Sequence, residues 1–334
     1  MISRVAGICF WMSRYLERVE NTIRVLTANY TYMLDGEPVM KDAWWSVVCV
    51  MGVEKEFEAL YSQQDKNQEE LIQKFLVWDD NNPVSIKNSL HIARENAKII
   101  RDSINNELWD TINRLWLWFI SSEAEVLYSR NKYLFCVTIQ EKCQSYQGVL
   151  HNSIPRTSPY EFMRLGFLLE RASQTTRILD INYHCVSDKS AVVDETAQEI
   201  AHWLNLLESC GAHEIFMMYD HAELIGSVIA KFLTLNQTFP RSILFCLERA
   251  HESLLHIQAS AHSQIGNNTR YKLEEVIAAL KLKPIDKILK NELHSLLNEI
   301  LENTDEICET LAADFFEPQR TIDAIEETMG GGQQ

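Results

Sequence analysis

The sequence predicts an all-α protein, a multi-helix bundle built from two related halves. The chain of 334 residues has only 11 glycines and 7 prolines, far below the usual fractions of about 7% and about 5%. Apolar residues recur every three or four positions, which is the period of an amphipathic helix. One helical phrase also occurs twice. These observations disfavour turn-rich sheets and glycine-lined phosphate loops.

The repeated phrase covers residues 16–30 and returns at 169–183. Leu, Glu, Arg, Thr, Arg, Leu, Asn and Tyr stand at matching places in both copies, and looser echoes lie at 247–253 and 93–101. Ionisable side chains that pair with one another and recur on helices predict a shared polar core. The bundle is therefore expected to contain an internal Glu-Arg helix repeat.

The first expected helix carries one buried stripe, formed by Met12, Leu16, Val19, Ile23, Leu26 and Tyr30. The same kind of spacing predicts further helices along the chain. They are expected at 39–60, 67–78, 84–105, 107–129, 131–150, 160–186, 194–210, 221–235, 241–262, 270–282 and 285–315. Pro159, Pro240 and Pro284 are interpreted as helix starts, because proline fits the first helical turn.

Two turns, at 79–83 and 154–159, interrupt the helical pattern, and neither is long enough to be a domain linker. We therefore expect a single helical domain over 1–329, with halves of about 1–155 and 156–329. The Gly-Gly-Gly-Gln-Gln end at 330–334 is expected to be a flexible tail.

Charge and cysteine content limit the partners and the compartment. The formal charge is -16, from 31 basic and 47 acidic side chains, which repels a nucleic-acid backbone. Eight scattered cysteines form no Cys-x-x-Cys pair, a pattern typical of buried, reduced thiols in the cytoplasm. No apolar run reaches the roughly 18 residues that span a bilayer. We expect a cytoplasmic protein that binds neither nucleic acid nor membrane.

The second copy of the phrase is apolar on every side, which is typical of a buried helix. Glu170, Arg171 and Arg177 are therefore expected inside the bundle. Glu170 and Arg177 are separated by about 10 Å along a helix, so each needs another partner. Arg24 has Glu20 one turn before it, whereas Arg177 has Ser173 there. A tertiary or ligand contact is the better explanation for Arg177.

Two interpretations of the repeated charges stay open. In the first, the side chains form a structural salt-bridge lattice that fixes the register of the helices. In the second, Arg18, Arg24, Arg171 and Arg177 converge on an anionic group such as a carboxylate or a phosphate, and the glutamates hold them in place. The two roles are compatible.

Seven segments make the sequence resemble the Alpha-E domain family, an all-helical family named for a Glu-Arg signature. The segments are Trp11–Arg18, Asn82–Ile86, Ala93–Ala97, Glu107–Asn113, Ile154–Arg156, Leu165–Arg171 and Phe239–Ser242. The repeat and these segments together give the candidate residues for binding an anion, a substrate or a partner. They are Arg14, Glu17, Arg18, Asn21, Arg24, Arg94, Arg156, Glu170, Arg171, Thr175, Arg177, Arg241, Glu248 and Arg249.

The resemblance implies association with a circularly permuted ATP-grasp protein, and with a transglutaminase-like protein and a proteasome-like peptidase. ATP-grasp proteins commonly activate a carboxylate as an acyl phosphate and pass it to an amine. This chain has neither a P-loop nor an ATP-grasp pattern, so ATP and Mg are expected on the partner. The expected role is a helical accessory or co-catalytic subunit of an amide-forming or peptide-modifying ligase, without independent activity.

Other functions remain as alternatives. Two Glu-x-x-His spacings, Glu199 with His202 and Glu248 with His251, are typical of di-iron sites in helical bundles. A metal-dependent bundle enzyme would need two further glutamates, which Glu17 and Glu170 could supply. The chain could also be a purely structural scaffold. The aromatic run at 116–119 is expected in the core or in a patch that binds a partner protein.

Overall fold

The computed structural model describes residues 3–34, 43–187, 195–219, 223–261, 265–283 and 290–316. All regular elements in these ranges are helices, which confirms the predicted all-α class. The expected start at Pro284 and the tail at 330–334 lie outside the described residues. No helix in the described ranges combines the length and apolar character needed to cross a membrane.

The part of the chain before residue 155 contributes α1 to α8. Their bounds are α1 Ser3–Leu34, α2 Ala43–Met51, α3 Glu54–Leu60, α4 Glu69–Val77, α5 Ile86–Ile99, α6 Asn106–Phe119, α7 Ser122–Arg130 and α8 Lys132–Ser153, with 3-10 turns at Gln63–Asp65 and Arg101–Ser103. Side-chain oxygens of Ser85, Asn105 and Ser121 accept hydrogen bonds from backbone N–H groups at the starts of α5, α6 and α7.

The rest of the chain contributes α9 to α15. Their bounds are α9 Ser158–Ser187, α10 Glu195–Ser209, α11 His213–Met217, α12 Gly226–Leu235, α13 Ile243–Ala261, α14 Asn267–Leu282 and α15 Lys290–Leu311, followed by a π-helical turn at Ala312–Phe316. The break between α8 and α9 falls at the boundary that the sequence suggested between the halves. Whether the halves are related throughout stays a prediction.

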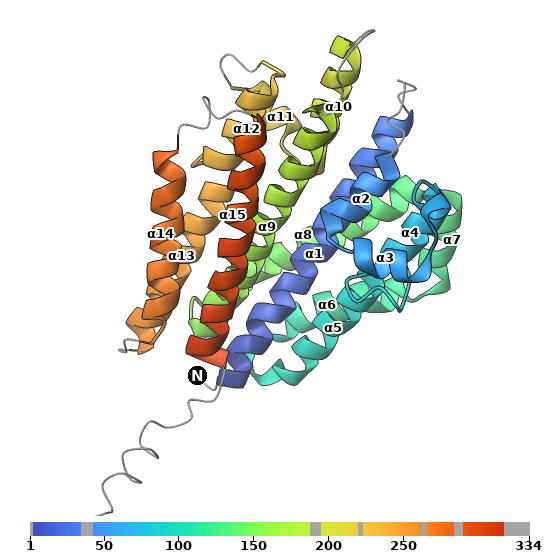
Figure 1. Ribbon diagram of the computed structural model, residues 1–334. Helices are drawn as coiled ribbons and strands as arrows, with labels where there is room; N and C mark the ends of the chain where they lie inside the picture. The colour runs from blue at the N-terminus through green and yellow to red at the C-terminus, as the bar shows by residue number, and fades with distance from the viewer. Residues whose placement is uncertain are drawn as a thin grey trace, which may run out of the picture.

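Helices α1 and α9 form the centre of the bundle and pack against each other along their length. Figure 1 shows α13, α14 and α15 on the side of α9, and α2 to α7 on the side of α1. The two central helices approach closely at Gly166, where an added Cβ would lie 2.2 Å from the carbonyl oxygen of Phe10. Both helices are buried on most faces, so polar residues on them must find partners inside the protein.

Some expected helices are divided in the structure. The helix expected over 39–60 is α2 and α3, because Gly52 adopts a φ of +69° and turns the chain. The helix expected over 107–129 is divided into α6, which ends at Phe119, and α7, whose start is capped by Ser121. Helix α5 ends at Ile99 instead of 105, and the short helix α11 had no expected counterpart.

We predict that Gly166→Ala destabilises the protein by at least about 1–3 kcal/mol, because the new methyl group forces α1 and α9 apart. Gly148→Ala on α8 is the matched control, since nothing lies within 4 Å of its Cβ position. It should stabilise by up to about 1 kcal/mol. Urea unfolding of both variants measures the difference, and equal midpoints would contradict the close packing of the central helices.

Candidate functional site

The repeated Glu-Arg pairs meet at the centre of the bundle and exchange partners. Arg171 Nε lies 2.7 Å from Glu17 Oε1, and Arg18 Nε lies 2.6 Å from Glu170 Oε1. Each copy of the phrase therefore supplies the acid for the guanidinium of the other copy. Gly166 lies against Phe10 and Glu170 against Arg14, and both contacts join residues 156 apart, so α1 and α9 run parallel with the two copies at the same level.

Glu170 holds two guanidinium groups and forms what we call the Glu170 group, with Arg14 and Arg18. Arg14 Nε donates to Glu170 Oε2 at 2.8 Å, and the glutamate is 1% exposed. Burial opposes ionisation of this carboxyl, but the charges and hydrogen bonds of Arg18 and Arg14 outweigh it. They lower the pKa of Glu170 from 4.5 to about 2. The predicted burial of Glu170 is confirmed.

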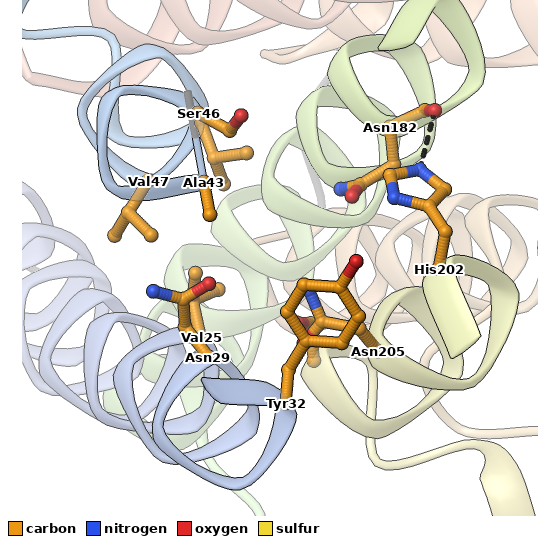
Figure 2. Close-up of a pocket in the computed structure, with 11 residues that line it drawn as sticks. Val25, Asn29, Tyr32, Ala43, Ser46, Val47, Asn182, His202 and Asn205 are labelled. Atoms are coloured by element: carbon orange, nitrogen blue, oxygen red, sulfur yellow. Dashed lines mark hydrogen bonds between the residues drawn. The ribbon is translucent and has the colours of Figure 1, made fainter. Parts of the chain in front are cut away.

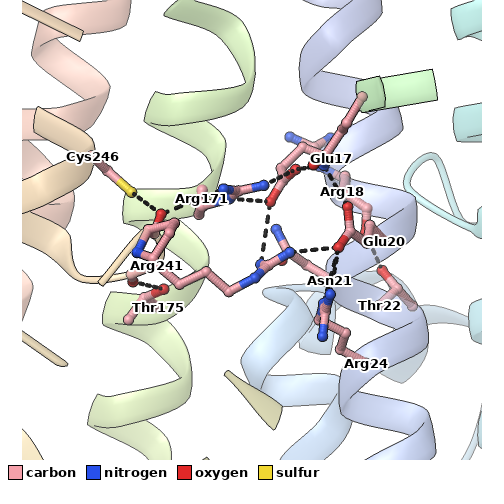
Figure 3. Close-up of polar contacts among 12 residues, drawn as sticks. Glu17, Arg18, Glu20, Asn21, Thr22, Arg24, Arg171, Thr175, Arg241 and Cys246 are labelled. Carbon is pink, nitrogen blue, oxygen red and sulfur yellow. Dashed lines mark hydrogen bonds and ion pairs between the residues drawn. The ribbon is translucent and has the colours of Figure 1, made fainter. Parts of the chain in front are cut away.

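Glu17 and Glu20 anchor a larger cluster, the Glu17 group, with Arg24, Arg171 and Arg241 (Figure 3). Arg241, which precedes α13, places Nη2 2.7 Å from Glu20 Oε1 and Nη1 3.3 Å from Glu17 Oε1. Arg24 Nη2 donates to the same Glu20 oxygen at 2.8 Å. The two glutamates are thus shared among three arginines from three elements.

Neutral side chains complete the Glu17 group. Gln147 of α8 donates to Glu17 at 3.1 Å and to Glu20 at 2.6 Å. Asn21 accepts from Arg241 at 2.6 Å, and the Thr175 hydroxyl donates to the backbone oxygen of Arg241 at 2.9 Å. These contacts hold the loop before α13 against α1 and α9.

The electrostatic environment of the Glu17 group is uneven. Burial raises the pKa of Glu20, but Arg241 and Arg24 outweigh this and lower it overall. Burial and the nearby charge of Arg171 lower the pKa of Arg241, against the pull of Glu20 and Glu17. The guanidinium of Arg241 is therefore crowded by other positive charges.

The two groups contain more arginines than glutamates. The Glu170 group has two arginines for one glutamate, and the Glu17 group has three for two. Counted over these members, each group has one positive charge in excess, and the nearby carboxylate of Asp305 also acts on Arg14. The side chains of Arg18 and Arg24 are 18% and 16% exposed, so the excess charge reaches the surface at these two arginines.

Arg24 and Arg177 occupy equivalent places in the repeat, and each lies against a helix end. A Cβ on Gly211 would lie 2.7 Å from Arg24 Nη1, and one on Gly52 would lie 2.8 Å from Arg177 Nη1. Both glycines have positive φ, and the next residue's N–H bonds back to a carbonyl five residues earlier, as in a Schellman turn. The guanidinium groups thus lie at the negative ends of α10 and α2.

A small polar cavity lies between α1, α2, α9 and α10 (Figure 2). The repeated asparagines Asn29 and Asn182 both line it, with His202 and Asn205 from α10. His202 Nε2 lies 2.7 Å from the Asn182 backbone oxygen. Asn29 Nδ2 and Asn205 Oδ1 are buried and have no hydrogen-bond partner among the described residues. The lining contains no Asp, Glu, Lys or Arg, so it suits a small neutral group.

Besides Arg177, four candidate residues lie outside both groups. Arg94 donates to Asn113 and Glu95 between α5 and α6. Arg156 donates to the His151 backbone oxygen in the loop before α9. The remaining two form surface ion pairs, Glu248 with Lys281 and Arg249 with Glu252. The structure therefore joins the echo at 247–253 to neither group.

The structure does not assemble the alternative metal site. Glu199 accepts a hydrogen bond from Trp203 at 3.2 Å. His251, on α13, lies 3.1 Å from Glu274, whereas His202 is on α10. The carboxylates of Glu17 and Glu170 form ion pairs with arginines. No group of three or more His, Cys, Asp or Glu side chains in the described ranges could hold a metal ion.

Sequence reasoning left two members out of the candidate set. The i,i+4 spacing of Glu20 from Arg24 could have identified Glu20. Its contact with Arg241 could not be predicted, because the two residues lie far apart in the chain. No sequence pattern identifies Gln147, because α8 has no repeated motif that includes it.

Buried thiols near the site are unreactive, since burial raises the pKa of Cys210 and Cys246 to about 12.

A wide cleft is lined by α4, the start of α5, the α6–α7 turn, α7 and the start of α8. Its volume is about 760 Å³, and Trp78 and Tyr128 line it with Lys74, Lys87 and Lys132, beside Glu70 and Glu125. In the aromatic run at 116–119, Phe119 is buried, whereas Leu117 and the following Ile120 are each 51% exposed. The run thus serves both the core and the surface.

Comparison with known proteins identifies one family. The sequence model of Alpha-E, described as a predicted alpha-helical domain with a conserved ER motif, matches residues 1–316. Neither the curated proteins nor the solved structures gave a match.

We predict that Arg171→Met destabilises the protein by about 3–5 kcal/mol, because it leaves the buried carboxylate of Glu17 short of its main partner. Arg249→Met, in a surface pair, should change the free energy of unfolding by less than about 1 kcal/mol. Urea unfolding measures both. Similar losses of unfolding free energy for the two variants would show that the central ion pairs contribute no more to stability than a surface pair.

The lowered pKa of Glu170 makes a pH-dependent contribution to stability. Because its folded pKa of about 2 lies below the usual 4.5, the contribution is present above pH 4.5 and is lost as the pH falls towards 2. Wild type should therefore exceed Glu170→Gln in unfolding free energy at pH 6, and the gap should narrow through this window. Chemical unfolding at stepped pH values measures the gap; a constant gap contradicts the pairing.

Proposed function

Because the chain belongs to the Alpha-E family, we propose that it is a helical accessory or co-catalytic subunit of an ATP-grasp ligase system. The system forms amide bonds or modifies peptides, and ATP and Mg are bound by the ligase, a circularly permuted ATP-grasp protein. A transglutaminase-like protein and a proteasome-like peptidase act with it. In this proposal, the present chain recognises an anionic group of the substrate or of the partner.

The excess of guanidinium groups over carboxylates carries this proposal. A buried cluster needs near balance of charge, because an uncompensated buried ion costs several kcal/mol. Helix ends supply part of the balance, since a helix C-terminus carries about half a negative charge. An external carboxylate or phosphoryl group at a partly exposed arginine would complete the balance, and a guanidinium fork matches either group.

The cleft beside α6 and α7 is the surface that we assign to the ligase. Aromatic rings form its floor, with the centroids of Trp78 and Phe119 4.5 Å apart. Of the three lysines that line it, Lys87 and Lys132 pair with acids of this chain. Lys74 is exposed and forms no ion pair among the described residues. A segment with apolar and acidic side chains is complementary to such a surface.

The test is reconstitution with the ATP-grasp protein, with products followed by mass spectrometry. Adding this chain should raise ligase-dependent product formation. Arg24→Gln should lower that gain roughly tenfold, because it removes a charge-assisted contact, whereas Arg249→Gln should not. Lys74→Glu should weaken the complex several-fold through charge repulsion. Lys55→Glu on α3, also at an exposed position, is its control.

The possible outcomes separate the functions. If the ligase forms product equally well with and without this chain, the accessory role is wrong. If the complex forms and product is made, but Arg24→Gln acts like Arg249→Gln, the arginines form only a structural lattice. A purely structural scaffold is the second candidate function, and the reciprocal ion pairs between α1 and α9 favour it.

A further inference from the structure

The two copies of the repeated phrase differ at one charged position. In the first copy Glu20 precedes Arg24 by one turn and binds it, with Arg24 Nε 3.0 Å and Nη2 2.8 Å from Glu20 Oε1. In the second copy Ser173 precedes Arg177 in the same way. The serine side chain lacks the carboxylate and the methylene group that carries it. The second copy therefore has the guanidinium without its acid.

The surroundings of Arg177 replace that acid only in part, through the negative end of α2. The side chain is half-buried and lies against Gly52 at the end of α2. In the part of the chain that the structure describes, no carboxylate lies within ion-pairing distance of Arg177, whereas Arg24, Arg171 and Arg241 all have one.

Ser173 gives a second, independent observation. It is 6% exposed, and its Oγ is buried without a hydrogen-bond partner among the described residues. A buried hydroxyl without a partner is costly, and such groups in native proteins call for an explanation. Arg177 and Ser173 stand four residues apart, on one face of α9. Side chains at this spacing are neighbours on a helix surface, so the guanidinium and the hydroxyl are placed to contact one ligand.

We propose that Arg177 and Ser173 bind the carboxylate of a ligand, in the place relative to α9 that the Glu20 carboxylate holds relative to α1. The ligand is a small carboxylic acid or a peptide with a free C-terminus. Two guanidinium N–H groups and one hydroxyl offer three donors, which match the acceptor positions of a planar carboxylate. This inference rests on the proposed function, since it names the anionic group, but binding to the chain alone can test it.

The substitution Ser173→Glu supplies the missing acid from the chain itself. It should raise the melting temperature, because Glu at this position reproduces the Glu20–Arg24 pair. It should also abolish ligand binding, because the new carboxylate occupies the site. Ser173→Glu with Arg177→Gln should lose the gain in melting temperature. A fall in melting temperature for Ser173→Glu alone would show that the site has no room for a carboxylate.

Direct binding is measured on the isolated full chain by NMR of the arginine Nε–H groups. The probes are acetate and acetyl-Ala-Ala with a free C-terminus, compared with acetyl-Ala-Ala-amide and inorganic phosphate at equal ionic strength. Saturable shifts with the two carboxylates only, lost in Arg177→Gln and kept in Arg249→Gln, support the site. No saturable shift, an equal response in Arg177→Gln, or binding of phosphate alone would overturn it. Arg177→Gln provides this test even if Ser173→Glu fails to fold.

The same variants separate this site from the proposed function. If carboxylates bind at Arg177 but the chain has no effect on the ATP-grasp ligase, the carboxylate site stands and the accessory role fails. If the chain stimulates the ligase equally with Arg177 and with Gln at this position, and the NMR shifts are absent, the accessory role stands without this site.

Discussion

The exchange of acids between α1 and α9 is the interaction on which the rest of the structure depends. Glu17 pairs with Arg171, and Glu170 pairs with Arg18, so each helix depends on the other for the partners of its Glu-Arg signature. Sliding or rotating one helix past the other would leave carboxylates and guanidinium groups unpaired in the core, at a cost of several kcal/mol each. The polar core therefore selects one register between two long helices whose apolar surfaces alone would tolerate several.

This constraint extends outward through shared partners. Arg241 reaches Glu17 and Glu20 from the turn before α13, and Gln147 reaches the same glutamates from α8. Helices on both sides of the central pair are thereby fixed to one charged centre. Arg24 and Arg177 link α10 and α2 in another way, since each guanidinium lies against a left-handed glycine that ends a helix. A side chain larger than hydrogen at either glycine would meet both backbone strain and the arginine.

The sequence predicted the helical class and the burial of Glu170, because apolar residues surround that part of α9 on every side. It could not predict that each glutamate pairs with the other copy, because the parallel register of two helices is a tertiary property. Arg94 shares the motif but lies on an amphipathic helix whose polar side holds it away from the centre. The turn at Gly52 was missed because the apolar α2 is followed directly by the strong helix formers of α3, so that the two resemble one helix. Local pattern thus determined elements and burial, and long-range contacts determined the site.

The unequal copies explain how a structural lattice can also bind a ligand. A fully symmetric duplication would place Glu at position 173 as well as at 20, and Arg177 would then have an acid one turn before it, as Arg24 has. With Ser173 in that place, Arg177 lies against the end of α2 without an acid one turn before it, and in our proposal the ligand supplies that acid. Preorganisation of this kind favours binding, since no side chain must be ordered when the anion arrives. In this proposal the charged residues of the first copy stabilise the fold, and Arg177 and Ser173 of the second copy supply the donors that bind the carboxylate.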